Sequence, residues 1–164
     1  MRRLVAALGV LALLVGGWLW WSSDERRLAR RLEEMERLFE KQGSEDQLSS
    51  FGRTRRIVQM FAPGFLVMAR PYEGSVSDLQ QLAAIVQRYR DSSERIEIDA
   101  ARREISIDSA RGTAESSADF AVSGGSGGRG ERFRARIAWV RLDGVWMIQE
   151  VEILEVLERG LLGL

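Results

Sequence analysis

The sequence lacks cysteine, histidine and asparagine altogether. Without cysteine the chain forms no disulfide and has no thiolate nucleophile, which suits either side of a membrane. Without histidine it holds no serine–histidine triad, no histidine-ligated metal and no histidine pH switch. We predict no cofactor and no metal site.

The chain also lacks an excess of charge of either sign. Its 24 basic and 24 acidic residues balance, and Lys41 is the single lysine beside 23 arginines. The arginines are scattered among acids and form no basic stripe, so we predict no nucleic-acid surface. With 45% hydrophobic and 29% charged residues in 164, the composition indicates one globular domain with an appendage and excludes a disordered chain.

A long apolar run opens the chain. Leu4 to Trp21 carries no charge over 18 residues, about 27 Å as a helix, which is enough to span a bilayer core. Arg2 and Arg3 precede it, and tryptophans crowd its far end. A cleaved signal peptide is the alternative, but no Ala-x-Ala site follows the run. We interpret residues 1–21 as a retained signal anchor that binds the membrane.

The orientation of this anchor rests on conflicting signals. Four arginines just after the run, at positions 26, 27, 30 and 31, favour a cytoplasmic domain. The short basic head with a signal-like apolar run favours insertion with the amino end inside. We expect a single-pass protein of a bacterial inner membrane whose carboxy-terminal domain is periplasmic.

Three helices are predicted after the anchor. Residues 22–43 form an amphipathic juxtamembrane helix with a Ser22–Glu25 capping box and one apolar face. A second helix, capped by Ser44, is expected to turn its apolar residues inward until Pro63-Gly64, and a third is capped by Ser77. Their predicted inward residues are Leu28, Leu32, Met35 and Phe39; Leu48, Phe51, Val58 and Phe61; and Leu79, Leu82, Ala83, Val86 and Tyr89.

From residue 96 onward the pattern alternates with a period of two. Isoleucines at 96 and 98 change phase before 105 and 107, which predicts a bulge or bend near Ala101 to Arg103. A strand with small inward residues, from Ala114 to Val122, should leave room inside a curved sheet. Two apolar strands then flank Asp143-Gly144, the pair that most favours a two-residue hairpin turn.

Continued without interruption, this hairpin register pairs Trp139 with Ile148 and Ile137 with Glu150. Glu150 would then lie on the buried face. Apolar surroundings disfavour the ionised form of a carboxyl group, so Glu150 could act as a general base near neutral pH. The alternative is that Glu150 and Glu152 pair with arginines at the sheet margin or face water.

The order of elements, three helices with one short strand at 65–69 and then antiparallel strands ending in a hairpin, is an α+β order. It resembles the nuclear transport factor 2-like superfamily, which includes the SnoaL-like and ketosteroid isomerase-like proteins. The local similarity lies in Ala135 to Val151, where a tryptophan-bearing strand, the Asp-Gly turn and Trp-Met-Ile are similar to the closing hairpin of such domains. The resemblance implies a cone-shaped fold of three helices packed on a curved antiparallel sheet, with a pocket between them.

The corresponding domain organisation has four parts. Residues 1–21 are the transmembrane anchor, 22–43 the first helix, 44–157 the rest of the α+β domain and 158–164 a short tail. The superfamily contains enzymes, small-molecule binders and assembly modules, some of them single-pass inner-membrane components of secretion and conjugation machines. The catalytic constellations of its enzymes find no match in this sequence, so no catalytic residue is carried across.

We therefore expect a membrane-anchored binding or scaffold domain that holds a protein partner, a second copy or a small apolar ligand at the membrane surface. The alternative is a small isomerase- or cyclase-like enzyme that uses Glu150 as its base, and a stalk in an envelope assembly is a third possibility. The candidate pocket residues are Glu150, Trp139, Ile148, Tyr89 and Asp99.

Overall fold

The computed structural model describes residues 23–69, 74–124 and 131–158. Within them lie helices α2 (Asp24–Phe39), α3 (Gln47–Val58) and α4 (Leu79–Ser92). The strands are β1 (Lys41–Gln42), β2 (Phe61–Ala69), β3 (Ser75–Val76), β4 (Arg95–Asp108), β5 (Thr113–Gly124), β6 (Glu131–Leu142) and β7 (Val145–Glu158). The predicted anchor, Leu4 to Trp21, lies outside the described residues. No described helix is long and apolar enough to cross a membrane.

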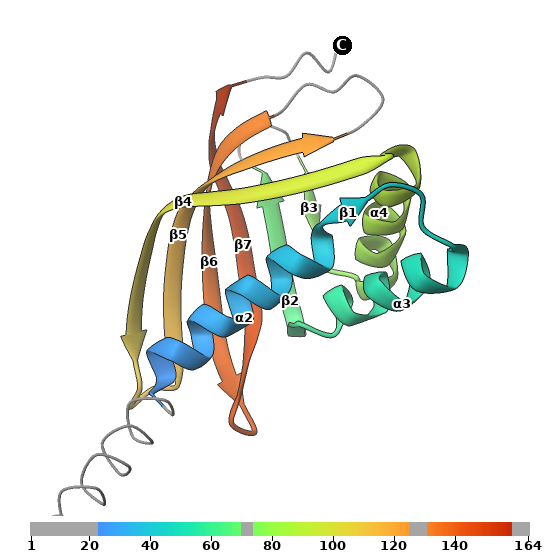
Figure 1. Ribbon diagram of the computed structural model, residues 1–164. Helices are drawn as coiled ribbons and strands as arrows, with labels where there is room; N and C mark the ends of the chain where they lie inside the picture. Colours follow the sequence, from blue (N-terminus) through green and yellow to red (C-terminus); the bar gives the residue numbers. More distant parts are fainter. Residues whose placement is uncertain (1–22, 70–73, 125–130, 159–164) are drawn as a thin grey trace, which may run out of the picture.

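All seven described strands form one sheet, in the order β1-β4-β5-β6-β7-β2-β3. The sheet curves strongly, α2 crosses its concave side, and α3 and α4 lie together at one flank (Figure 1). This is the predicted α+β architecture with one difference. Strand β2 pairs with β7 in parallel, whereas the other pairs are antiparallel. The chain enters β2 directly after α3, at the end of β7 that is next to the hairpin turn, so the two strands run in the same direction. The sheet is therefore mixed.

The hairpin turn is the predicted one. Leu142 pairs with Val145, and both turn residues, Asp143 and Gly144, have positive φ, at 49° and 79°. That backbone matches the strand twist, and aspartate followed by glycine tolerates it best. The predicted bulge in β4 is also present, since its register shifts between Ala101 and Glu104.

The predicted register fails farther from the turn. Trp139 does pair with Ile148, but the pairing shifts between Trp139 and Ala138, so Glu150 lies opposite Ala138 and Ile137 opposite Val151. Two further shifts follow toward the end of β7. Each extra residue on β7 bends the strand and sharpens its twist, and repeated bulges thereby close the sheet into a cone.

Two of the helices are oriented or capped differently from the prediction. Asp46 and Asp78 cap α3 and α4, each accepting a backbone hydrogen bond, from Ser49 and Gln81. Helix α3 turns its polar Ser50 and Thr54 inward with Ile57, while Leu48 and Phe51 are 85% and 66% exposed. The inward-facing prediction for these two apolar residues is wrong. The cause lies on α4, where Gln87 hydrogen bonds with both Ser50 and Thr54.

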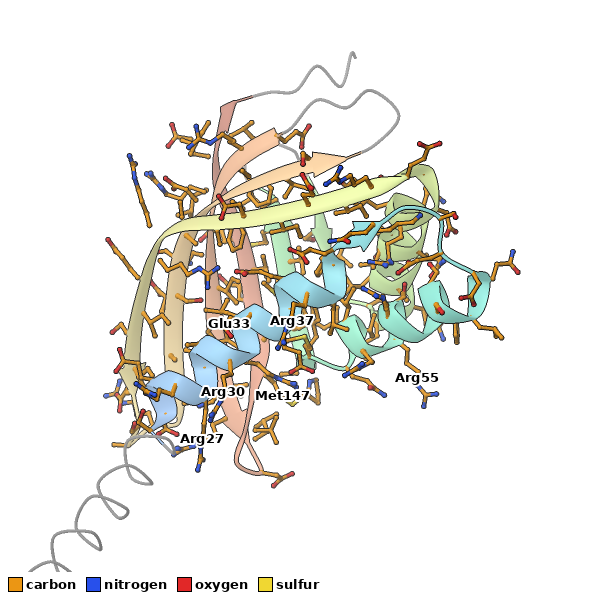
Figure 2. All side chains as sticks on the ribbon, viewed as in Figure 1. Arg27, Arg30, Glu33, Arg37, Arg55 and Met147 are labelled. Carbon is orange, nitrogen blue, oxygen red and sulfur yellow. The ribbon has the colours of Figure 1, made fainter. Side chains whose placement is uncertain are left out.

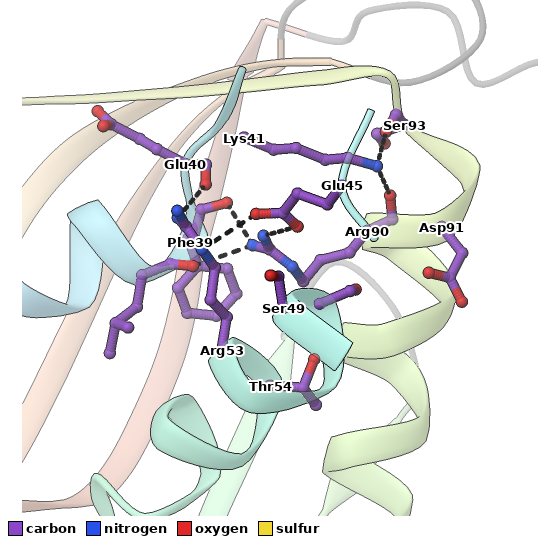
Figure 3. A network of polar contacts seen from close by, with 12 residues as sticks. Phe39, Glu40, Lys41, Glu45, Ser49, Arg53, Thr54, Arg90, Asp91 and Ser93 are labelled. Carbon is purple, nitrogen blue, oxygen red and sulfur yellow. Dashed lines mark hydrogen bonds and ion pairs between the residues drawn. The ribbon is translucent and has the colours of Figure 1, made fainter. Parts of the chain in front are cut away.

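Helix α2 is shorter than predicted. It begins after Ser23, which makes no side-chain cap, and ends at Phe39, so Gly43 follows the short strand β1 instead of ending the helix. The end of α2 is held by a buried guanidinium. Arg90, 0% exposed on α4, donates from Nη1 to the carbonyl oxygens of Leu38 and Phe39 at 2.9 Å each (Figure 3).

The same network ties α3 and β1 to this corner of the fold. Nη2 of Arg90 donates to Glu45, which also pairs with Arg53 at 3.0 Å. The Lys41 ammonium, itself buried, donates to the carbonyl oxygens of Arg90 and Ser93 at 2.7 Å each (Figure 3). A buried cation with several acceptors fixes the angle between the elements that supply them.

Candidate functional site

A cavity of about 340 Å³ lies between the concave face of the sheet, the second half of α2, and α4. The hairpin end of the cone is filled instead, by Leu28, Trp139, Trp146 and Ile148, each 0–2% exposed. Toward the other end, β5 and β6 place the small side chains of Ala118 and Ala135 opposite each other on the inward face. The small inward residues predicted for β5 do therefore lie inside the curved sheet.

The cavity wall is predominantly apolar. Its lining includes Met35 and Phe39 from α2, Leu82 from α4, and Phe133 and Ile153 from the sheet. Among the described residues of the lining, three side chains can ionise, namely Glu36, Tyr89 and Glu131. An apolar cavity with a few polar groups is the usual form of a small-molecule site.

Glu36 is the most unusual of the three. Its side chain is 13% exposed, and Oε2 accepts a 2.8 Å bond from Nη2 of Arg103 on β4. Its other oxygen, Oε1, is buried without a hydrogen-bond partner. Burial raises the pKa of Glu36 above its ordinary value, and repulsion from Glu33 and Glu40 adds to this, although Arg103 acts in the opposite direction. Glu36 thus lines the cavity, its buried Oε1 lacks a hydrogen-bond partner, and its carboxyl group tends to keep its proton.

Tyr89 and Glu131 are less enclosed. Tyr89, 39% exposed on α4, lines the cavity, so the cavity reaches the surface beside it. Burial raises the pKa of its phenol above the ordinary value, and the charge of Glu131 adds to that effect. The phenol therefore stays protonated at neutral pH and can donate a hydrogen bond.

The structure separates the other residues predicted for the pocket. Trp139 and Ile148 lie on the inward face but in the filled end of the cone, where the indole Nε1 donates to Ser116 at 2.9 Å. Asp99 is exposed on the outer face of β4. None of these three lines the apolar cavity.

Glu150 does not face the interior. The bulge in β7 turns it to the outer face, where Nη2 of Arg136 lies 3.2 Å from Glu150 and 2.6 Å from Glu152. This is the alternative arrangement weighed from the sequence, an arginine pairing with both carboxylates. We therefore do not assign Glu150 the role of a general base.

Glu36 was not selected from the sequence, although the signal was present. It lies four residues after Leu32 and next to Met35 on the apolar stripe of α2. Helix α2 carries many balanced charges, so one more glutamate looked like part of its solvated face. The described residues contain no group of three or more acidic side chains placed to hold a metal ion.

Comparison with known proteins identifies the fold. No family model matches the chain, and no curated protein matches its sequence. Solved structures do match. A candidate scytalone dehydratase from Novosphingobium aromaticivorans superposes with a TM-score of 0.64 at 10% identity, covering 82% of this chain and 85% of that one. A Nostoc punctiforme protein of unknown function with a cystatin-like fold gives 0.61 at 12% identity, covering 81% and 90%.

The chain has a nuclear transport factor 2-like fold. A third match with this fold, a candidate calcium/calmodulin-dependent protein kinase II association domain from Xanthomonas campestris, has a TM-score of 0.57 at 12% identity and covers 81% and 89%. At such identities the likeness shows the fold alone. The three matches differ in their described roles, so the function has to be argued from the site.

Proposed function

We propose that this chain is a membrane-anchored domain that binds a small apolar ligand in its cone, with Glu36 as the polar contact. The observation that carries the proposal is the apolar cavity of about 340 Å³ lined by Glu36, a carboxylate of which one oxygen is buried without a hydrogen-bond partner. This volume falls within the range of roughly 300–1,000 Å³ typical of ligand pockets. The anchor is the sequence-based part of the proposal and rests on Leu4 to Trp21.

The chemistry of the wall defines the ligand. An apolar body gains about 25 cal/mol for each Å² that it removes from water. A hydroxyl on that body could donate to Glu36 after a rotation of its side chain brings Oε1, which has no hydrogen-bond partner among the described residues, to the cavity surface. Satisfying a buried acceptor adds about 1–3 kcal/mol, because the acceptor has already been removed from water. We therefore expect a neutral, mainly apolar molecule with one hydrogen-bond donor.

Binding of 2-naphthol and naphthalene to the full chain in lipid nanodiscs tests this, using equilibrium dialysis with empty nanodiscs as the blank. Ile153→Trp fills the cavity and should abolish saturable binding of both probes. Leu154→Trp is the matched control, since the neighbouring Leu154 is exposed and does not line the cavity. Glu36→Gln should weaken 2-naphthol by about tenfold and leave naphthalene unchanged. Equal binding by Ile153→Trp and the unmodified chain would refute the proposal.

A second candidate function is proton transfer to or from a bound apolar substrate. The observation that favours it is the raised pKa of Glu36 combined with the place of this residue in the cavity lining. A raised pKa brings a carboxyl group closer to the operating pH and makes it a better general acid or base. In this mechanism Oε1 would accept the proton, while Arg103 holds Oε2 and fixes the plane of the carboxyl.

The pKa of Glu36 decides whether this second function is chemically available. Carbon-13 NMR of glutamate side-chain carboxyls, with Glu36→Gln to assign the signal, measures it directly. We expect a midpoint above the ordinary value of 4.5. A midpoint at or below 4.5 would remove proton transfer by Glu36 and leave the binding proposal standing.

A further inference from the structure

The hairpin end of the cone has features that suit a lipid surface. At this end the β6–β7 turn exposes two apolar side chains, Leu142 at 38% and Val145 at 48%. The neighbouring β4–β5 turn carries Arg111, whose side chain is 83% exposed. Arg27 is exposed nearby on the first turns of α2 (Figure 2). Acidic residues lie there too, since Asp143 is in the β6–β7 turn and Asp108 pairs with Arg111 at 3.5 Å. Apolar side chains with arginines beside them are typical of segments that rest in a headgroup layer.

The start of α2 is fastened to the same end. Asp24, the first residue of α2, accepts a 2.7 Å bond from Nη1 of Arg141 and a 2.9 Å bond from the Ser109 hydroxyl. Arg141 is one residue before Leu142 in β6, and Ser109 belongs to the β4–β5 turn. The chain therefore enters the described domain beside both turns, only three residues after Trp21 ends the apolar run in the sequence.

We infer that the β6–β7 turn, with Leu142 and Val145, contacts the membrane surface, so that the cone stands upright on the bilayer. This inference rests on the proposed anchor and adds the orientation of the domain. A span that ends at Trp21 holds Asp24 within about 10 Å of the interface, since three residues reach no farther. The contacts of Asp24 then bring both turns to that level.

The position of the cavity gives this orientation a functional consequence. Phe133 lines the cavity near the start of β6, and Leu142 ends the same strand. Nine residues of strand, at about 3.3 Å each, separate them by up to about 30 Å. The surface-accessible Tyr89 likewise belongs to the cavity end. The ligand would therefore reach the cavity from the aqueous phase and not from the lipid.

The absence of cysteine makes a clean test possible, because a single introduced cysteine can be labelled uniquely. Val145→Cys, Ser75→Cys and Leu48→Cys each carry a polarity-sensitive nitrobenzoxadiazole fluorophore on the full chain in vesicles of phosphatidylcholine and phosphatidylglycerol. Lipids with a headgroup nitroxide serve as the quencher. Ser75 is exposed at the far end of the sheet, and Leu48 is exposed on α3. Melting curves of the three labelled proteins check that each remains folded.

We expect quenching at Val145→Cys to exceed that at both other positions several-fold. Stronger quenching at Leu48→Cys would overturn the inference, because the domain would then lie on α3. Equal, weak quenching at all three positions in protein that floats with the vesicles would also overturn it while leaving the anchor intact. Protein that does not float with the vesicles would refute the anchor and this inference together.

Discussion

Replacing Arg90 by methionine should destabilise the domain strongly, because its guanidinium joins three elements at a buried corner. The substitution leaves two carbonyl oxygens, of Leu38 and Phe39, without their donor and removes a charged partner of Glu45. Three bonds from the charged guanidinium, two to carbonyl oxygens and one to a carboxylate, at about 1.5 kcal/mol each give a loss of about 4.5 kcal/mol. This is a large part of the roughly 5–15 kcal/mol that stabilises a typical domain.

The matched control is Arg53→Met. Arg53 also pairs with Glu45, at 3.0 Å, and its Nη1 donates to the carbonyl oxygens of Arg37 and Glu40, but its side chain is 43% exposed and water can replace these bonds. Its loss should cost less than about 1 kcal/mol. Urea unfolding of the full chain in mild detergent, followed by circular dichroism, measures both free energies of unfolding. Equal losses for the two variants would refute the claim that burial gives Arg90 its importance.

Arg90→Met should also affect the cavity. Arg90 holds the carbonyl end of α2, and Phe39 at that end lines the cavity together with Glu36 one turn earlier. We therefore expect weaker binding of 2-naphthol by Arg90→Met under conditions where the variant remains folded, and a smaller change for Arg53→Met, whose contacts with the end of α2 are exposed or part-buried.

Three further predictions concern single residues. Asp119→Asn should make the loss of stability in acid less steep, because hydrogen bonds from Arg134 lower the pKa of Asp119. The stability that Asp119 contributes is present above its ordinary pKa of 3.8 and is lost as the pH falls through the lower folded value. Acid titrations of both proteins would show this. Glu36→Gln should have the same stability as the unmodified chain in acid and a higher stability as the pH rises past 4.5, because a raised pKa makes ionisation costly in the folded state. Melting temperatures at a series of pH values test this, and a difference that does not change with pH would contradict it. Gly144→Val should cost about 1–2 kcal/mol in urea unfolding because φ is +79° there, and Gly52→Val, at a glycine without positive φ, serves as the comparison.

Local chemistry explains what the sequence predicted correctly. The Asp143-Gly144 turn depends on two residues that accept positive φ, and the bulge near Ala101 follows from a change of phase within one strand. Both signals are complete within a few residues. The curved sheet and the cavity behind small inward residues follow from these elements and from the alternation of β5.

The local sequence did not predict the face of the sheet on which Glu150 lies. A strand can gain one residue at a bulge without any change in its apolar composition, so nothing in β7 marks the shift after Ile148. One such residue transferred Glu150 to the outer face. Leu48 and Phe51 failed for a related reason, because the polar partner that orients α3, Gln87, lies on a different helix.

The two ends of the cone differ in how densely they are packed. At the hairpin end the indoles of Trp139 and Trp146 fill the space between sheet and helix, and α2 is pinned there through Asp24. At the other end the sheet presents alanines, and α2 is held by Arg90 at its terminus and by the pair of Glu36 with Arg103. Dense packing at one end supplies the stability that an open apolar cavity at the other end lowers. Under the proposed anchoring, a tether at the filled end would leave the cavity end facing the aqueous phase, from which the proposed ligand would enter.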